Sequence, residues 1–155
     1  MIDLSITPEA VLAGVDAVFL THLHEDHWDE AARKTVASRH GTEEMLRTPG
    51  FSRMIDDTTG FFFERTGCRS VYLAGDTVWG PWVSATLARR RPGVIVLNTG
   101  NAVVTDFPQS IIMGAQDVLR ATQEATDATV VAVHMDAINH CIHVHRDDLC
   151  DYLKA

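Results

Sequence analysis

The sequence predicts a single α/β domain over residues 1–155, and three observations lead to this prediction. Short apolar runs that are typical of buried strands alternate with segments that carry the start and stop signals of helices. The length is sufficient for one core, and 46% hydrophobic with 22% charged residues is an ordinary globular composition. No internal repeat or low-complexity linker divides the chain.

The N-terminal segment is predicted to form a short helix and then a strand. Thr7 supplies a hydroxyl cap, Pro8 suits the first helical position, and Glu9 places an acid in the first turn. Gly14 is a suitable stop. The apolar residues 15–20 are predicted to form a buried strand. Residues 28–37 are predicted to be helical in part. We expect a loop over residues 38–42, then a short helix that ends at Arg47, and then a break at residues 48–50.

The second half of the chain is predicted to alternate strands with helices. The predicted strands are residues 60–65, 69–74, 94–97 and 129–133, and the predicted helices are residues 81–91, 114–125 and 146–153. A turn at Thr66-Gly67 joins the first two strands, and Pro92-Gly93 stops the first of these helices. Val118 and Leu119 are expected on the buried face of the second helix.

Four metal-ligand side chains lie close together directly after the first apolar run. His22 and His24 are two residues apart, so they share a face in an extended chain, and Asp26 and His27 follow where the chain must turn. Imidazole nitrogens and carboxylate oxygens are ligands for a divalent ion such as zinc. A single histidine would more often be an ordinary polar residue, but such a cluster is hard to explain as solvated surface. It predicts a site for one ion or for two neighbouring ions.

Polar groups also follow the later predicted strands. His22 stands just past the end of the first apolar run, and Asp76, Asn98 and His134 each stand just past the end of a later one. Sites of α/β sheets form at the carboxyl ends of strands, so we expect these side chains to meet at one edge. The alternatives are a turn or cap role for Asp76, a turn role for Asn98 and a surface position for His134.

Several segments of this sequence resemble the metallo-β-lactamase superfamily. His22-Leu23-His24-Glu25-Asp26-His27 is similar to its His-x-His-x-Asp-His signature, and Leu73-Ala74-Gly75-Asp76-Thr77 is similar to its strand-end Gly-Asp-Thr. Ser38-Arg39-His40-Gly41 and Val131-Ala132-Val133-His134 are similar to segments that carry further histidine ligands. The segments from Tyr72 to Trp79 and from His134 to Cys141 look like the branch that contains ascorbate-6-phosphate lactonase and related hydrolases. The implied fold is an αββα sandwich, here shortened at the N-terminus and between the first two metal motifs.

The resemblance implies a binuclear metal centre and a hydrolase activity. One ion would be held by His22, His24 and His40. The other ion would be held by Asp26, His27 and His134, and Asp76 would bridge the two ions. The expected cofactor is one or two divalent ions, zinc first, with manganese or iron as alternatives. A metal-activated hydroxide would attack an ester, lactone or phosphodiester of a small molecule. Asp26 would orient the hydroxide. His140 would protonate the leaving group or contact the substrate, unless it is a loop histidine bonded to the backbone.

The role of His40 requires a particular local structure. A helix through residue 37 would carry the chain roughly 15 Å from His27. Three extended residues span about 10 Å in total, which would not bring His40 back to a metal ion held at His27. We therefore expect the helix to end near Arg33 and residues 35–39 to return extended.

The remaining properties limit the partners. A net charge of −8 argues against unspecific binding to nucleic acid or to anionic membranes. Three cysteines are no disulfide framework, which favours a cytoplasmic location. Sheet edges left by the shortening favour a homo-oligomer. The rival to the hydrolase is a truncated, non-catalytic metal-binding protein that retains the cluster.

Overall fold

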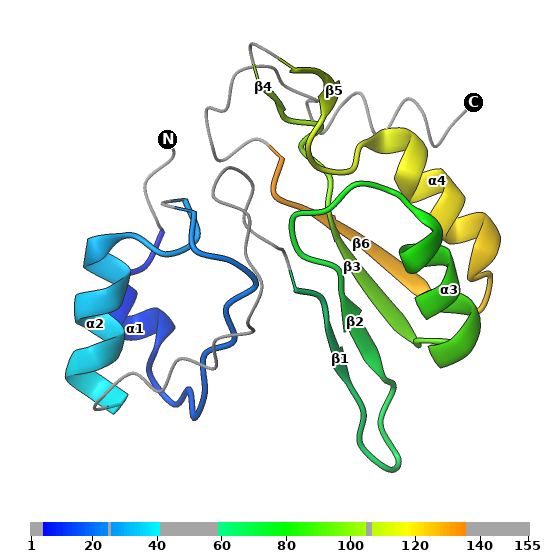
Figure 1. Cartoon of the computed structure of the whole chain (residues 1–155). Coiled ribbons are helices and arrows are strands. Elements are labelled where there is room, and N and C mark those ends of the chain that lie inside the picture. Colours follow the sequence, from blue (N-terminus) through cyan, green and yellow to red (C-terminus); the bar gives the residue numbers. More distant parts are fainter. Residues whose placement is uncertain (1–4, 25, 41–58, 105–106, 136–155) are drawn as a thin grey trace. The chain divides into compact units, whose positions relative to one another are not determined.

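The computed structural model of the chain describes residues 5–24, 26–40, 59–104 and 107–135 (Figure 1). The chain divides into two compact units, residues 2–57 and residues 58–155, and each is described by itself. A single domain over residues 1–155 stays a prediction. None of the described helices has the length and apolar character that a membrane span requires.

The residues of the N-terminal unit that the structure describes form two helices, α1 (Pro8–Val11) and α2 (Glu30–His40). The predicted helix start is confirmed, because the Thr7 hydroxyl accepts a hydrogen bond from the Ala10 N–H at 3.3 Å and Pro8 occupies the first turn. Gly14 has a left-handed φ of 80°, which suits a residue after a helix end.

The prediction of a strand over residues 15–20 is wrong. These residues form no strand, and Val18 and Phe19 are 43% and 58% exposed. A strand exists only when a second extended segment pairs with it. The described part of the N-terminal unit contains helices, turns and irregular segments, and no strand.

The prediction that the second helix ends near Arg33 is also wrong, because α2 continues to His40. Asp29 caps it by accepting a hydrogen bond from the Ala32 N–H at 2.6 Å, and Lys34 pairs with Glu30 at 2.7 Å, four residues apart. Nothing in the sequence breaks the helix before Gly41. The expected loop over residues 38–42 therefore starts no earlier than residue 41. The predicted helices to Arg47 and over residues 146–153 lie outside the described residues.

The C-terminal unit is built on a mixed four-stranded sheet with the order β1-β2-β3-β6. The strands are β1 (Phe61–Phe63), β2 (Val71–Leu73), β3 (Val94–Asn98) and β6 (Thr129–Val133). β1 is antiparallel to β2, and the three strands β2, β3 and β6 run parallel. The predicted strands of this half are thus confirmed. A hairpin of β4 (Val103–Val104) and β5 (Phe107–Ser110) was not expected from the sequence.

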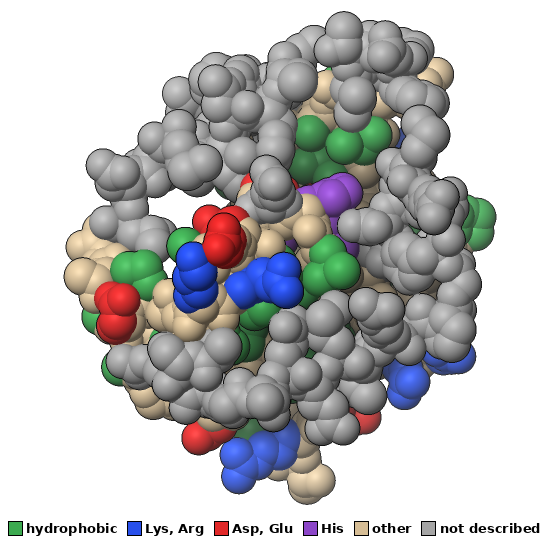
Figure 2. All heavy atoms as spheres, turned by 60° about the vertical axis from the view of Figure 1, so that its left-hand side comes forward, with side chains coloured by type: hydrophobic (Ala, Val, Ile, Leu, Met, Phe, Trp, Pro, Cys, Tyr) green, Lys and Arg blue, Asp and Glu red, His purple; other side chains and the backbone are tan. Residues whose placement is uncertain are grey.

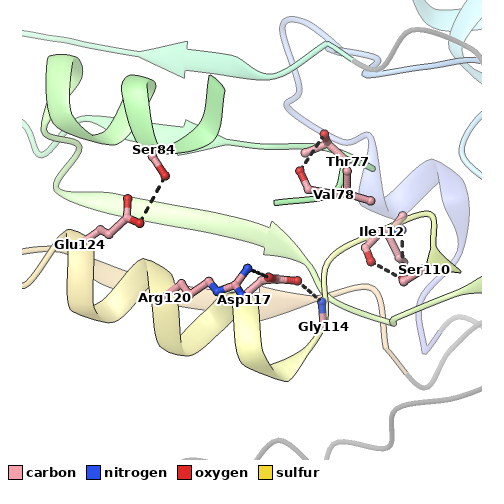
Figure 3. A network of polar contacts seen from close by, with 9 residues as sticks. All are labelled: Thr77, Val78, Ser84, Ser110, Ile112, Gly114, Asp117, Arg120 and Glu124. Atoms are coloured by element: carbon pink, nitrogen blue, oxygen red, sulfur yellow. Dashed lines mark hydrogen bonds and ion pairs between the residues drawn. The ribbon is translucent and has the colours of Figure 1, made fainter. Parts of the chain in front are cut away.

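Two helices, α3 (Pro81–Arg90) and α4 (Ala115–Glu124), connect the parallel strands. Both connections cross the sheet in the same direction, so right-handed crossovers place both helices on one face (Figure 1). Figure 3 shows the Ser84 hydroxyl of α3 donating to the Glu124 carboxylate of α4 at 3.2 Å. At the start of α4, the Gly114 N–H donates to Asp117 at 3.0 Å, which caps the helix.

The core lies between these helices and the sheet. Along β3, Ile95 and Leu97 are fully buried while Val94 and Val96 are half-buried, as the two-residue period of a strand requires. Tyr72 of β2 pairs with Ile95 and faces the same side. The buried core side chains are Tyr72, Ala74, Val83, Leu87, Ile95, Leu97, Met113, Ala115, Val118 and Ala121. The helix prediction for Val118 is confirmed, and Leu119 is half-buried.

Candidate metal centre

The first group of candidate ligands lies in the N-terminal unit, between α1 and α2. The ring centroids of His22 and His24 are 4.7 Å apart, which confirms that these two side chains share a face. The backbone N–H groups of His27 and Trp28 both donate to the His24 carbonyl, at 2.9 Å and 2.8 Å, and this turn brings the His27 ring within 4.1 Å of His22. Asp26 Oδ2 lies 3.3 Å from His27 Nε2.

The donor set of this N-terminal cluster fits a divalent metal ion. One ligand atom from each of His22, His24 and Asp26 lies within 4.8 Å of the others. Ligands of a tetrahedral zinc ion with bonds of about 2.1 Å stand about 3.4 Å apart, so these three atoms lie near the spacing that an ion requires. The Thr21 hydroxyl contacts His22 Nδ1 at 2.9 Å, and such a contact favours ligation through Nε2. His24 is exposed, whereas His22 is buried. Figure 2 shows that histidine side chains (purple) are visible at the molecular surface.

The second group lies in the C-terminal unit, at the carboxyl ends of the parallel strands. Asp76 follows β2, Asn98 is the last residue of β3, and His134 follows β6. The Asn98 Nδ2 donates a hydrogen bond to Asp76 Oδ1 at 2.5 Å, and Asp76 Oδ2 lies 4.0 Å from His134 Nε2. The side chains of Asp76 and His134 are only 13% and 12% exposed. The prediction that the strand-end groups meet at one edge of the sheet is confirmed for Asp76, Asn98 and His134. For His22, which follows residues that form no strand and lies in the N-terminal unit, it stays a prediction.

The backbone at this edge is tightly constrained. Gly75 has a φ of 72° and turns the chain after β2, so that Asp76 reaches the end of β3. His134 itself has a left-handed φ of 60°, which is uncommon for a residue with a side chain and typical of functional sites. Gly100 passes so close to His134 that an added Cβ would lie 2.5 Å from its carbonyl oxygen. The Thr99 N–H donates to the Val133 carbonyl at 3.0 Å and holds the adjacent strand end.

Two predicted site residues are not placed by the described structure. His40 is the last residue of α2, and its side chain lies outside the described residues. The helix carries the His40 backbone about 15 Å along its axis from Glu30, so the extended return that we expected for this ligand does not form. His140, expected to protonate the leaving group, also lies outside the described residues. Both roles stay predictions.

Sequence reasoning did not identify the partner of Asn98 or the contact of Gly100. The strand-end position of Asn98 was visible in the sequence, but its hydrogen bond to Asp76 depends on the parallel register of β2 and β3. In the sequence, Gly100 looks like an ordinary turn glycine after a strand. Its close contact is with His134, which follows β6 and lies over thirty residues later in the chain. Burial also raises the pKa of the Tyr72 hydroxyl above its usual 10.0, but Tyr72 lies in the core rather than at this edge.

Comparison with known proteins agrees with this arrangement, although no family model matches the chain. The UPF0173 protein YddR of Bacillus subtilis (strain 168) is 26% identical over 191 residues, which cover 99% of this chain and 74% of YddR. An alignment longer than the 155 residues of this chain means that YddR has inserted segments.

Two solved structures are similar over nearly the whole chain. A possible metal-dependent hydrolase from Veillonella parvula DSM 2008 has a TM-score of 0.83 and 32% identity, covering 99% of this chain and 74% of that one. The isothiocyanate hydrolase from Delia radicum gut bacteria has a TM-score of 0.78 and 30% identity, covering 94% of this chain and 72% of that one. This chain is shorter than both. With this identity over about three quarters of each relative, the chain belongs to the same family as these metallo-β-lactamase-like hydrolases.

Proposed function

We propose that the protein is a metal-dependent hydrolase that uses hydroxide to cleave an ester, lactone or phosphodiester of a small molecule. The observation that carries the proposal is the convergence of His22, His24 and Asp26, whose ligand atoms lie within 4.8 Å of one another. Membership of a family that contains hydrolases supports the reaction type. The lactone is included because two segments resemble the branch that contains ascorbate-6-phosphate lactonase.

The proposed metal ligands are all imidazoles or carboxylates: His22, His24, Asp26, His27, His40, Asp76 and His134. Zinc is the expected ion, and manganese or iron is the alternative, because nitrogen and oxygen donors suit all three. The support for combining them is the order of the motifs along the chain and the family to which it belongs.

The chain's own residues would divide the work of hydrolysis. When bound, divalent ions supply Lewis acidity and make hydroxide available at neutral pH. Asp26 would accept a hydrogen bond from the attacking water and orient it toward the carbonyl carbon or phosphorus. His140 would donate a proton to the leaving oxygen as the scissile bond breaks.

The test begins with the metal content of the purified protein. We expect up to two equivalents of zinc, manganese or iron, as the ligand set predicts, and loss of hydrolysis on chelation with recovery on adding the metal back. Substrates to screen are an activated ester, a lactone, a phosphodiester and, because one relative is an isothiocyanate hydrolase, an isothiocyanate. His24→Ala should lose metal, whereas Asp127→Asn, at a side chain 93% exposed in the C-terminal unit, should retain it. No bound transition metal after reconstitution would overturn the proposal.

A second candidate is a metal-binding protein without hydrolase activity. One observation favours it: α2 continues to His40, so the extended segment that we expected to present this ligand is helical. This candidate predicts metal binding at His22, His24 and Asp26 with no turnover of any substrate class. Metal-dependent turnover that His24→Ala abolishes would exclude it.

A further inference from the structure

The carboxylate of Asp76 accepts a hydrogen bond from a buried side chain at the sheet edge. Asn98 is 7% exposed, and its Nδ2 donates to Asp76 Oδ1. Because a carboxylate can only accept hydrogen bonds, the amide nitrogen rather than the amide oxygen must face it. The other oxygen, Oδ2, lies on the side of His134 Nε2, at 4.0 Å. The two oxygens of Asp76 therefore have different neighbours.

The side chain of Asn98 is not needed to hold the strand. Its backbone already pairs with Val133 in the register of β3 and β6, and the following residue, Thr99, donates its N–H to the Val133 carbonyl. The β2–β3 pairing is extended independently by a hydrogen bond of 3.0 Å from the Ala74 N–H to the Val96 carbonyl. A buried amide at this position thus has a partner that belongs to the candidate site and not to the ladder.

We propose that Asn98 is a positioning residue, which fixes the Asp76 carboxylate so that Oδ2 is presented together with His134 Nε2 to a divalent metal ion. This inference rests on the proposed function, because it assumes that Asp76 and His134 are ligands. Outer-shell donors of this kind fix the orientation of a ligating carboxylate before the ion arrives. Loss of this donor removes one constraint on the orientation of the Asp76 carboxylate, and metal binding must then fix an orientation that the apo protein holds less well.

The experiment compares Asn98→Leu with the wild-type chain. Leucine has the same number and branching of side-chain heavy atoms as asparagine but no donor, so the apo protein should keep its circular dichroism spectrum and fold. Zinc affinity, measured by competition with a chromophoric chelator, should fall about 10-fold to 100-fold. The visible absorption spectrum of the cobalt-substituted protein should change in position or intensity, because a reoriented carboxylate alters the coordination geometry.

A matched control is Ser84→Ala, which also removes a hydrogen bond from a side chain to a carboxylate in the same unit. Ser84 donates to Glu124 at 3.2 Å between α3 and α4 (Figure 3), away from Asp76. This variant should bind zinc and give the cobalt spectrum of the wild type. A fall in affinity for Ser84→Ala equal to that for Asn98→Leu would mean that general destabilisation accounts for both, and would overturn the inference.

The wild-type chain and Asp76→Ala separate this inference from the proposed function. Wild-type protein that binds no metal overturns both proposals. Wild-type protein that binds metal, with Asp76→Ala impaired and Asn98→Leu unchanged in affinity and cobalt spectrum, overturns only the positioning role of Asn98. If Asn98→Leu fails to fold, Asn98→Ser provides the test, because the shorter serine side chain cannot reach the Asp76 carboxylate as the amide does. A folded Asn98→Ser protein with the zinc affinity and cobalt spectrum of the wild type would also overturn the positioning role of Asn98.

Discussion

Replacement of Gly100 by alanine is expected to damage the strand-end ligands more than the fold. The new Cβ would lie 2.5 Å from the His134 carbonyl oxygen, whereas such contacts essentially never fall below 3.0 Å, so one segment must move by about 0.5 Å. Distances at a metal site tolerate only about 0.2 Å. A displaced His134 should therefore lower zinc affinity about 10-fold or more. Overpacking should also cost about 1–3 kcal/mol, offset by about 0.4–1 kcal/mol from the reduced freedom of the unfolded chain.

The assay measures the two effects separately. Chelator competition reports zinc affinity, and urea unfolding of the metal-free protein reports stability. The control is Gly93→Ala at the opposite end of β3, where the added Cβ would meet side-chain atoms of Arg69 at 3.1 Å. This control should change stability but leave zinc affinity unaltered. Wild-type zinc affinity in a folded Gly100→Ala protein would refute the reasoning that ties the position of His134 to this glycine.

Three further predictions concern stability and assembly. Leu97→Ala, at a fully buried core position, should lower the free energy of unfolding by about 2–5 kcal/mol, measured by urea denaturation. The pKa of the buried Tyr72 is raised above 10.0, so the unfolded chain loses this proton at a lower pH than the folded chain does, and stability should fall as pH rises above 10.0. Tyr72→Phe should reduce that fall, measured by alkaline denaturation. An identical pH profile for the variant and the wild type would contradict the assignment. We also expect the chain to self-associate, because Phe19 and Leu23 are 58% and 48% exposed. Sedimentation should show weaker association for Phe19→Glu than for the wild type. A wild-type chain that stays monomeric at high concentration would exclude this expectation.

The elements of the C-terminal unit could be predicted from the sequence because their signals are local. Pro81 at a helix start and the Pro92-Gly93 stop define α3, and apolar runs of the right length define β3 and β6. The meeting of the polar strand ends then follows from parallel strand direction alone. One failure concerns a local signal: nothing in the sequence breaks α2 before Gly41, but the expected role of His40 led us to predict an earlier end. Two others concern interactions that no local pattern encodes. Whether residues 15–20 form a strand depends on a partner segment, and the orientation of the Asn98 amide depends on the neighbouring strand.

The spacing of the ligands along the chain sets an order for their assembly during folding. His22, His24 and Asp26 lie within five residues, so even the unfolded chain keeps them near one another. Asp76 and His134 come together only after β6 has joined β3, a pairing that matches Val94 with Thr129, 35 residues further along the chain. Such non-local pairing forms slowly. Metal ions present during refolding therefore meet the N-terminal cluster first, and their binding to the unfolded chain reduces the stability that they add to the native state.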